Sequence, residues 1–152
     1  MKKQLFLSLM LLIGANFTAQ SQNFAQDTTD IKNVVIDFFE LFVKNDLKYL
    51  DKHCTPTFEL YESGMIWNND TLRNIIYKRQ TQKRNWERKN EFKFIKFNVN
   101  KDIAWVSYFN TAHLTNGATQ EKRTNKWLES AVLVKKKKKW YLTQMHSTTL
   151  GK

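Results

Sequence analysis

Residues 127–147 read WLESAVLVKKKKKWYLTQMHS, and this stretch decides the fold. Apolar residues recur with the two-residue period of a β-strand over 127–134 and again over 140–147. The lysine run Lys135–Lys139 between them supplies a short turn, so the two strands form a hairpin. Both faces of each strand are largely apolar or aromatic. This predicts central strands of a sheet, covered on one face by helices and on the other by a partner or a second sheet layer.

Two more segments, residues 91–99 and 103–114, have strand character, and the first strand of the hairpin extends back to about residue 120. The connections contain typical turn residues, among them Asn116-Gly117. Links this short favour antiparallel neighbours. The second half of the chain therefore predicts a meander of four antiparallel strands.

The chain before these strands has the pattern of helices and short strands. Apolar residues recur at intervals of three and four from residue 30 to about Lys44, which predicts an amphipathic helix. Pro56 stops a shorter second helix, because proline disfavours helical backbone in the residue before it. The remaining predictions are short strands at 57–61 and 65–67 and a third helix that begins at Asn69 or Asp70.

The N-terminal segment has the composition of a secretory signal. Lys2 and Lys3 precede an apolar run over residues 5–13, and Ala19-Gln20-Ser21 matches a small-x-small cleavage site. The apolar run is too short to span a bilayer, which takes roughly 20 residues. We therefore expect removal of residues 1–21, export to the periplasm or the medium, a flexible lead-in over residues 22–29 and one domain over residues 30–150.

The chain is strongly basic. Its formal net charge is +11, and removal of residues 1–21, with two lysines and no acid, leaves +9. Such a surface favours anionic partners. The basic segment Lys78–Lys89 around Trp86, together with Lys135–Lys139, is compatible with binding of a polyanion. Alternatively, the lysine run is a solvated turn that prevents edge pairing. An exported protein meets little nucleic acid, so we do not expect nucleic acid as a partner.

The usual signals of a metal or cofactor site are missing from the sequence. No two histidines have the i, i+4 spacing of a helical zinc site, and the chain has only four glycines, which do not form a phosphate-binding loop. We expect no metal and no cofactor. Cys54 is the only cysteine, so an intrachain disulfide is impossible. A buried thiol is the expected state, and an intermolecular disulfide or an exposed reactive thiol are the alternatives.

The order of elements, two helices, a short strand pair, a helix and four long strands, resembles the nuclear-transport-factor-2-like superfamily. The segments that carry the resemblance are Asp102–Val106, Trp127–Leu133, Trp140–Leu142 and Met145–Ser147. Within the superfamily the chain is most similar to the SnoaL-like and polyketide-cyclase-like branch. The resemblance implies an α+β fold in which a cone-shaped, curved antiparallel sheet wraps around the N-terminal helix. It also implies a pocket inside the cone and, often, a homodimer through the outer face of the sheet.

The chain departs from the ketosteroid-isomerase branch of this superfamily. There, a tyrosine on the first helix and an aspartic acid in the sheet form an oxyanion hole beside a carboxylate base. The first helix of this chain has Phe38, Phe39 and Phe42 but no tyrosine, and residues 103–114 contain no acid. The resemblance therefore does not carry isomerase chemistry to this chain.

Glu129 and His146 are the candidate catalytic residues. Glu129 lies in a predicted apolar strand, where burial raises the pKa of a carboxyl group. If the turn is centred on Lys137, residues whose numbers sum to 274 or 275 lie opposite one another, so Glu129 faces Met145 or His146. A Glu129–His146 pair could act in general acid–base catalysis. The alternatives are an ion pair of Glu129 with Arg123, Lys122 or a residue of the basic segment, and a histidine satisfied by a backbone carbonyl.

Six further residues are expected near the pocket or its mouth, either as ligand contacts or as plain packing: Tyr61, Glu62, Trp67, Trp86, Trp105 and Tyr108. An aromatic-lined cavity suits a flat, mainly apolar small molecule with a few polar groups. Three functions follow. The first is binding of such a ligand without catalysis, the second is an acid–base enzyme that uses Glu129 and His146, and the third is a basic surface that binds polyanions.

Overall fold

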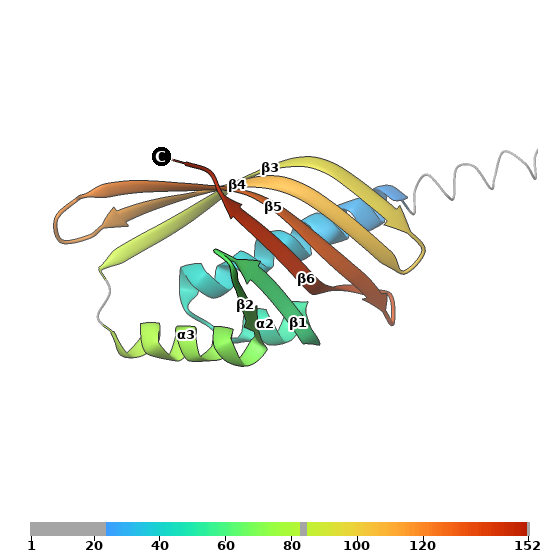
Figure 1. Ribbon diagram of the computed structural model, residues 1–152, viewed down its shortest axis with the longest axis horizontal. Helices are drawn as coiled ribbons and strands as arrows, with labels where there is room; N and C mark the ends of the chain where they lie inside the picture. Colours follow the sequence, from blue (N-terminus) through green and yellow to red (C-terminus); the bar gives the residue numbers. More distant parts are fainter. Residues whose placement is uncertain (1–23, 83–84, 152) are drawn as a thin grey trace, which may run out of the picture.

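The computed structural model describes residues 24–82 and 85–151. The chain is helical from residue 24, where the described residues begin, to residue 44. The elements that follow are α2 (Lys48–His53), β1 (Cys54–Glu62), β2 (Met65–Asn68), α3 (Asn69–Thr81), β3 (Trp86–Asn100), β4 (Ile103–Asn116), β5 (Lys122–Lys136) and β6 (Lys139–Thr149). The expected α+β class is confirmed, with helices against one face of a curved sheet (Figure 1).

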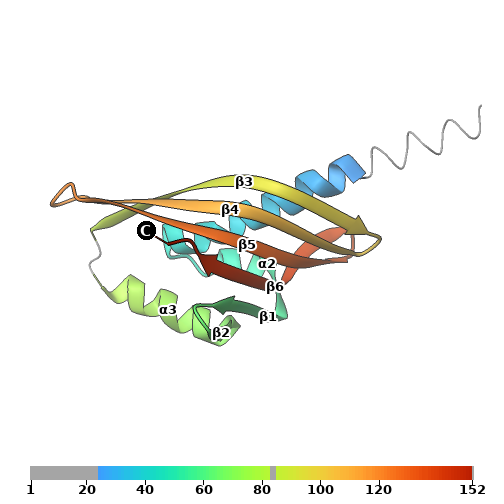
Figure 2. The same ribbon diagram turned by 45° about the horizontal axis from the view of Figure 1, so that its top comes forward.

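The six strands form one sheet in the order β2-β1-β6-β5-β4-β3. Strands β3 to β6 are the predicted antiparallel meander, and β5 and β6 are its central strands, as residues 127–147 indicated. The short β1–β2 hairpin joins the meander through a parallel pairing of β1 with β6. The sheet curves around the N-terminal helix without closing into a barrel (Figures 1 and 2).

The N-terminal helix packs into the concave face of the sheet (Figure 2). Its residues Ile31, Val35, Phe38 and Leu41 are fully buried, and they have the spacing of one helix face. The ring of Phe38 lies 5.4 Å from that of Phe58 on β1. The predicted amphipathic helix is therefore present, and its apolar side forms the centre of the core.

Two extra residues bend the long strands. The register of β3 against β4 shifts at Ile95, and that of β6 against β5 shifts at Thr143. A bulge increases strand twist and also changes which face the later side chains point to. Beyond Thr143 the concave face therefore receives Met145 and Ser147, which are buried, and not His146, which is exposed. Strict two-residue alternation from Trp140 predicts the reverse, with His146 on the concave face and Met145 and Ser147 on the outer face.

Three boundaries differ from those expected from sequence. Residues 24–29, expected as part of a flexible lead-in, are helical. Cys54 and Pro56 belong to β1, whose pairing with β6 is irregular between Cys54 and Glu59, so the missing N–H of the proline breaks no regular ladder. Strand β3 begins at Trp86, five residues earlier than predicted. Cys54 is buried, as expected, and burial raises the pKa of its thiol.

The predicted signal segment, residues 1–21, lies outside the described residues. Within residues 24–82 and 85–151, no helix has the length and apolar character needed to cross a membrane.

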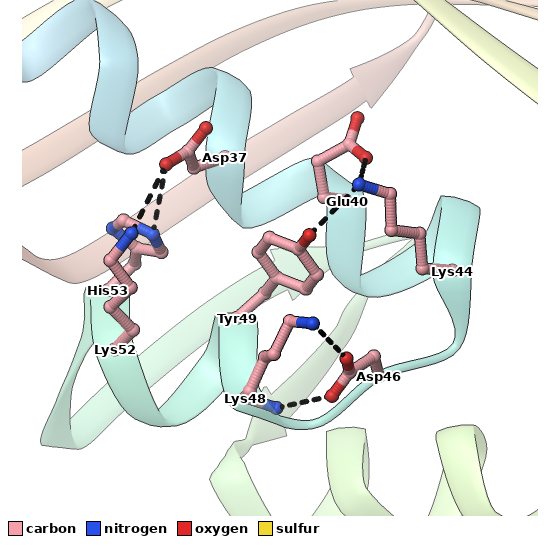
Figure 3. Close-up of polar contacts among 8 residues, drawn as sticks. All are labelled: Asp37, Glu40, Lys44, Asp46, Lys48, Tyr49, Lys52 and His53. Atoms are coloured by element: carbon pink, nitrogen blue, oxygen red, sulfur yellow. Dashed lines mark hydrogen bonds and ion pairs between the residues drawn. The ribbon is translucent and has the colours of Figure 1, made fainter.

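Polar contacts join the N-terminal helix to the hairpin β5–β6 and to α2. Near its start, the Asp27 carboxylate accepts a hydrogen bond from Lys135 Nζ at 2.6 Å and one from Trp140 Nε1 at 2.9 Å. Two turns before its end, Asp37 Oδ2 lies 3.3 Å from Nε2 of His53 on α2 (Figure 3). The contacts of Asp27 explain why the helix extends before residue 30, because they anchor its first turns to the β5–β6 hairpin.

We predict that Asp27→Ala lowers the free energy of unfolding by about 2 kcal/mol, because it leaves two partly buried donors without their shared acceptor. Chemical denaturation measures the change. Glu40→Ala is the matched control on the same helix, since Glu40 forms only an i, i+4 pair with the exposed Lys44 (Figure 3) and should change stability little. Equal effects of the two substitutions would contradict the anchoring role of Asp27.

Candidate functional site

A row of polar side chains crosses the concave face of the sheet. Tyr108 on β4 is in register with Glu129 on β5, Glu129 with Ser147 on β6, and Ser147 with Glu62 on β1. Directly paired residues on neighbouring strands present their side chains on the same face. We call these four residues the polar row.

Glu129 is the centre of the polar row and is 4% exposed. Its Oε1 accepts a hydrogen bond from Ser147 Oγ at 3.1 Å, whereas its Oε2 is buried without a hydrogen-bond partner among the described residues. The hydroxyl of Tyr108 and both amide atoms of Asn110 are also buried and unpartnered within this part of the chain. Buried polar atoms without partners are costly and rare, so this cluster is the candidate functional site of the described residues.

The environment of Glu129 brings its carboxyl group close to half protonation at neutral pH. Burial raises its pKa to about 7 from an ordinary value of 4.5, and the charge of Glu62 adds to the rise. Ser147, whose hydroxyl donates to Glu129, acts in the opposite direction, as do the nearby polar groups of Tyr108 and Asn110, and burial prevails. Burial also raises the pKa of Tyr108, so its hydroxyl stays protonated and able to donate.

Aromatic rings form the apolar walls beside the polar row. The ring of Phe92 lies 6.0 Å from that of Tyr108 and 5.2 Å from that of Phe39 on the N-terminal helix. The Arg88 guanidinium lies 5.5 Å from the ring of Phe42 and 5.7 Å from that of Trp127. Aromatic rings thus pack beside Tyr108 at one end of the polar row, and the cationic group of Arg88 lies near two further rings.

An open hollow of about 870 Å³ adjoins the polar row at the end of the sheet. Its lining includes Glu62, a member of the row, and Trp127, which lies two residues from Glu129 on the same strand. The hollow therefore reaches the row at Glu62, whereas Glu129, Tyr108 and Ser147 do not line it. Another hollow, of about 540 Å³, lies near His53 and Trp140 at the opposite end of β6 and contains no member of the row.

The expected Glu129–His146 pair does not form. His146 is in register with Ser130 and points to the outer face, whereas Glu129 is in register with Ser147. The physical reason is the bulge at Thr143: paired numbers sum to 275 as far as Leu133 and Leu142, and to 276 beyond it. Glu129 also forms no ion pair with Arg123, whose Nε donates to Glu121 Oε1 at 2.8 Å.

Of the six residues expected near the pocket, Glu62 and Tyr108 belong to the polar row. The other four lie elsewhere. Tyr61 donates to Glu59 Oε2 at 2.8 Å, Lys96 lies over Trp105 at 5.6 Å, Arg123 lies over Trp86 at 4.7 Å, and Trp67 packs against the core from β2. Tyr61 and Trp105 occupy strand positions that point away from the polar row, since each is adjacent in sequence to a buried concave-face residue.

Three residues of the site were not predicted. Ser147 stands out in sequence as a polar residue in an apolar strand, but simple alternation does not place it opposite Glu129. Asn110 could have been found from its two-residue spacing from Tyr108, which puts both on one face of β4. Arg88 has no sequence signal that separates it from the other basic residues of its segment.

The two basic segments, Lys78–Lys89 and Lys135–Lys139, do not form one continuous basic surface. Trp86 is in register with Asn116 at one end of the β3–β4 pair, whereas Lys135 N donates to Asp102 O at the other end. A polyanion could not follow both along one short path. Within residues 24–82 and 85–151 there is also no group of three or more His, Cys, Asp or Glu side chains that could hold a metal ion.

Several solved structures share this fold. The chain is similar to a ketosteroid isomerase-like protein from Erwinia carotovora atroseptica SCRI1043 (16% identity, 82% of this chain and 96% of that chain, TM-score 0.63). It is also similar to a nuclear transport factor 2-like superfamily protein from Salmonella enterica subsp. enterica serovar Typhimurium str. LT2 (12%, 84% and 94%, 0.69). A third is the association domain of CaMKII from C. elegans (18%, 82% and 97%, 0.65).

These identities are low, so the structures support the fold alone. No curated protein matches the chain. The family of SnoaL-like domains matches residues 31–150, which include the N-terminal helix from Ile31 onward and every strand of the sheet. By this match and by its fold, the chain belongs to the family of SnoaL-like domains.

Proposed function

We propose that the protein binds a small, mainly apolar molecule on the concave face of its sheet, with Glu129 as the central polar contact. The observation that carries the proposal is the set of buried polar atoms of Glu129, Tyr108 and Asn110 that have no hydrogen-bond partner within residues 24–82 and 85–151, with aromatic rings beside Tyr108. Rings favour a flat ligand, and a few polar atoms fix its orientation. The SnoaL-like fold, which commonly binds small molecules or acts as an isomerase or cyclase, supports this function.

The polar row suits a hydroxyl or carbonyl group on the ligand. Tyr108 supplies a hydroxyl donor, Asn110 supplies a donor and an acceptor, and Glu129 supplies either, depending on its protonation. The ligand reaches them through the hollow lined by Glu62 and Trp127. The proposed signal at residues 1–21 would place this binding protein outside the cytoplasm.

A second candidate function is acid–base catalysis on the bound molecule. The observation that favours it is the pKa of Glu129, about 7, which lets this carboxyl accept or donate a proton at neutral pH. His146 has no part in this version, because it lies on the other face of the sheet. Glu129 would act with Tyr108 as the neighbouring hydrogen-bond donor.

The outer face of the sheet supports a homodimer. Its exposed apolar residues include Ile103 (60% exposed), Ile95, Leu128, Trp105 and Phe109, and the described helices cover only the opposite face. A contiguous exposed apolar surface is typical of an interaction site. The similarity to a CaMKII association domain is consistent with self-association through this fold.

Native mass spectrometry of the protein purified from its own periplasm or medium tests ligand binding. We expect a small molecule to co-purify, and Asn110→Leu to weaken its binding about tenfold, because an apolar side chain of similar size removes two polar contacts. Ser130→Ala is the control, since Ser130 neighbours Glu129 on β5 but is exposed on the outer face. Full occupancy in Asn110→Leu, or no ligand in the unsubstituted protein, would contradict the proposal.

The pH dependence of stability tests the state of Glu129. Between pH 4.5 and about 7 the folded chain binds this proton more tightly than the unfolded chain, so its contribution to stability is lost as the pH rises. Glu129→Gln mimics the protonated form. It should therefore be more stable than the unsubstituted protein above pH 7, by about 3 kcal/mol at most, and lose this advantage below pH 4.5.

Denaturation at pH 5 and pH 8 measures this difference, with Glu87→Gln, on the exposed side of β3, as a control for loss of a surface charge. A Glu129 carboxyl that titrates below pH 5 in an NMR experiment would remove the basis for acid–base catalysis and leave ligand binding intact.

The dimer is tested by light scattering after size-exclusion chromatography. Phe109→Lys places a charge in the centre of the outer face and should shift the protein from dimer to monomer. Tyr77→Lys is the matched control, because Tyr77 is an exposed aromatic residue on α3, away from the sheet surface. A monomer without substitution, or a dimer that survives Phe109→Lys unchanged, would show that the outer face is not the interface.

A further inference from the structure

We infer that the ligand of the concave face carries a carboxylate, and that the Arg88 guanidinium binds it while the polar row binds the other end of the molecule. This inference rests on the proposed function and names the chemical class of its ligand. The candidate ligands are small, flat organic acids with a hydroxyl or carbonyl group at some distance from the carboxylate.

The first support is the way Arg88 is held. Its guanidinium contacts two rings, Phe42 of the N-terminal helix and Trp127 of β5, at 5.5 and 5.7 Å from the ring centroids. Its Nε donates to Asn90 Oδ1 at 3.0 Å. Stacking and this hydrogen bond fix the orientation of the guanidinium plane while leaving the fork of terminal nitrogens for another partner.

The second support is the missing counter-ion. Arg88 is partly buried, and burial, with a smaller contribution from Arg79, lowers its pKa to about 10, so it is still charged at neutral pH. Within residues 24–82 and 85–151 it forms no ion pair. A partly buried charge without an ionic partner is costly, and an arginine fork matches a carboxylate bidentately.

Glu129 and Glu62 do not replace that counter-ion. Both stabilise the charged form of Arg88 through space, but neither forms a hydrogen bond or ion pair with it. The pKa of Glu129 is raised and not lowered, which is the reverse of what a close pair with a guanidinium produces. The charge of Arg88 is therefore stabilised through space by Glu129 and Glu62. Its terminal guanidinium nitrogens have no hydrogen-bond partner within residues 24–82 and 85–151.

The third support is the position of Arg88 relative to the hollow. Trp127, on which Arg88 stacks, lines the hollow of about 870 Å³ together with Glu62 and Lys126. A ligand that enters there meets the ring of Trp127 beside Arg88, and Glu129 lies two residues further along the same strand. The apolar part of the ligand would rest on the rings between the two polar ends.

Two matched probes, 2-naphthoate and its neutral isostere 2-naphthamide, test the inference by titration calorimetry on the full chain. The acid should bind at least tenfold more tightly than the amide at low salt. Arg88→Gln should reduce the affinity for the acid about tenfold and change that for the amide less than twofold. Arg123→Gln is the control, because Arg123 also stacks on a tryptophan but is paired with Glu121.

Equal affinities for the acid and the amide in the unsubstituted protein would overturn the assignment of Arg88 and leave the proposed ligand site standing. Equal weakening of both probes by Arg88→Gln would also overturn it, since that result indicates a packing role. Failure of both probes to bind would overturn the aromatic-lined site and this inference together. If Arg88→Gln does not fold, the acid-to-amide affinity ratio and its decrease with added salt still decide the question.

Discussion

One extra residue in β6 determines which side chain meets the buried carboxylate of this sheet. The bulge at Thr143 turns Met145 and Ser147 to the concave face and His146 to the outer face. The group that faces Glu129 is consequently the hydroxyl of Ser147 and not the imidazole of His146. The pKa of Glu129 stays at about 7, and its Oε2 has no hydrogen-bond partner among the described residues. The bulge at Ile95 in β3 contributes to the same curvature on the far side of Tyr108. Sheet shape and site chemistry thus have a common origin.

The polar row works against the stability of the core that surrounds it. The N-terminal helix buries Phe38 and Leu41 completely, and rings from the helix and from β3 meet beside Tyr108. In such surroundings an apolar residue in place of Glu129 would remove a charge that burial disfavours. A fold that keeps unpartnered carboxyl, amide and hydroxyl groups in its interior is locally less stable than it could be, and this is the usual signature of a binding or catalytic site.

The sequence was sufficient for the architecture and insufficient for the site. The period-two pattern and the lysine turn predicted the central hairpin correctly, because both depend on neighbouring residues. Glu129 and Tyr108 were recognised individually as polar or amphipathic groups in strands. Ser147 was not recognised as the partner of Glu129, because Thr143 is an ordinary strand residue and no neighbouring residue indicates a bulge there. The early start of the first helix was missed for a similar reason, since its anchor joins Asp27 to Lys135 and Trp140, more than a hundred positions away.

Successive side chains of β5 point to opposite faces of the sheet, so the same strand contributes to both faces. Glu129 points into the concave side, and its neighbours Leu128 and Ser130 are exposed on the outer side. The same holds on β4, where Tyr108 is buried and Phe109 is exposed. A second copy covering Leu128 and Phe109 would therefore restrain the two strands that present Glu129 and Tyr108, and restraint of those strands lowers the entropy lost when a ligand is bound. Self-association through the outer face and binding in the concave face would then be thermodynamically coupled, although no residue takes part in both.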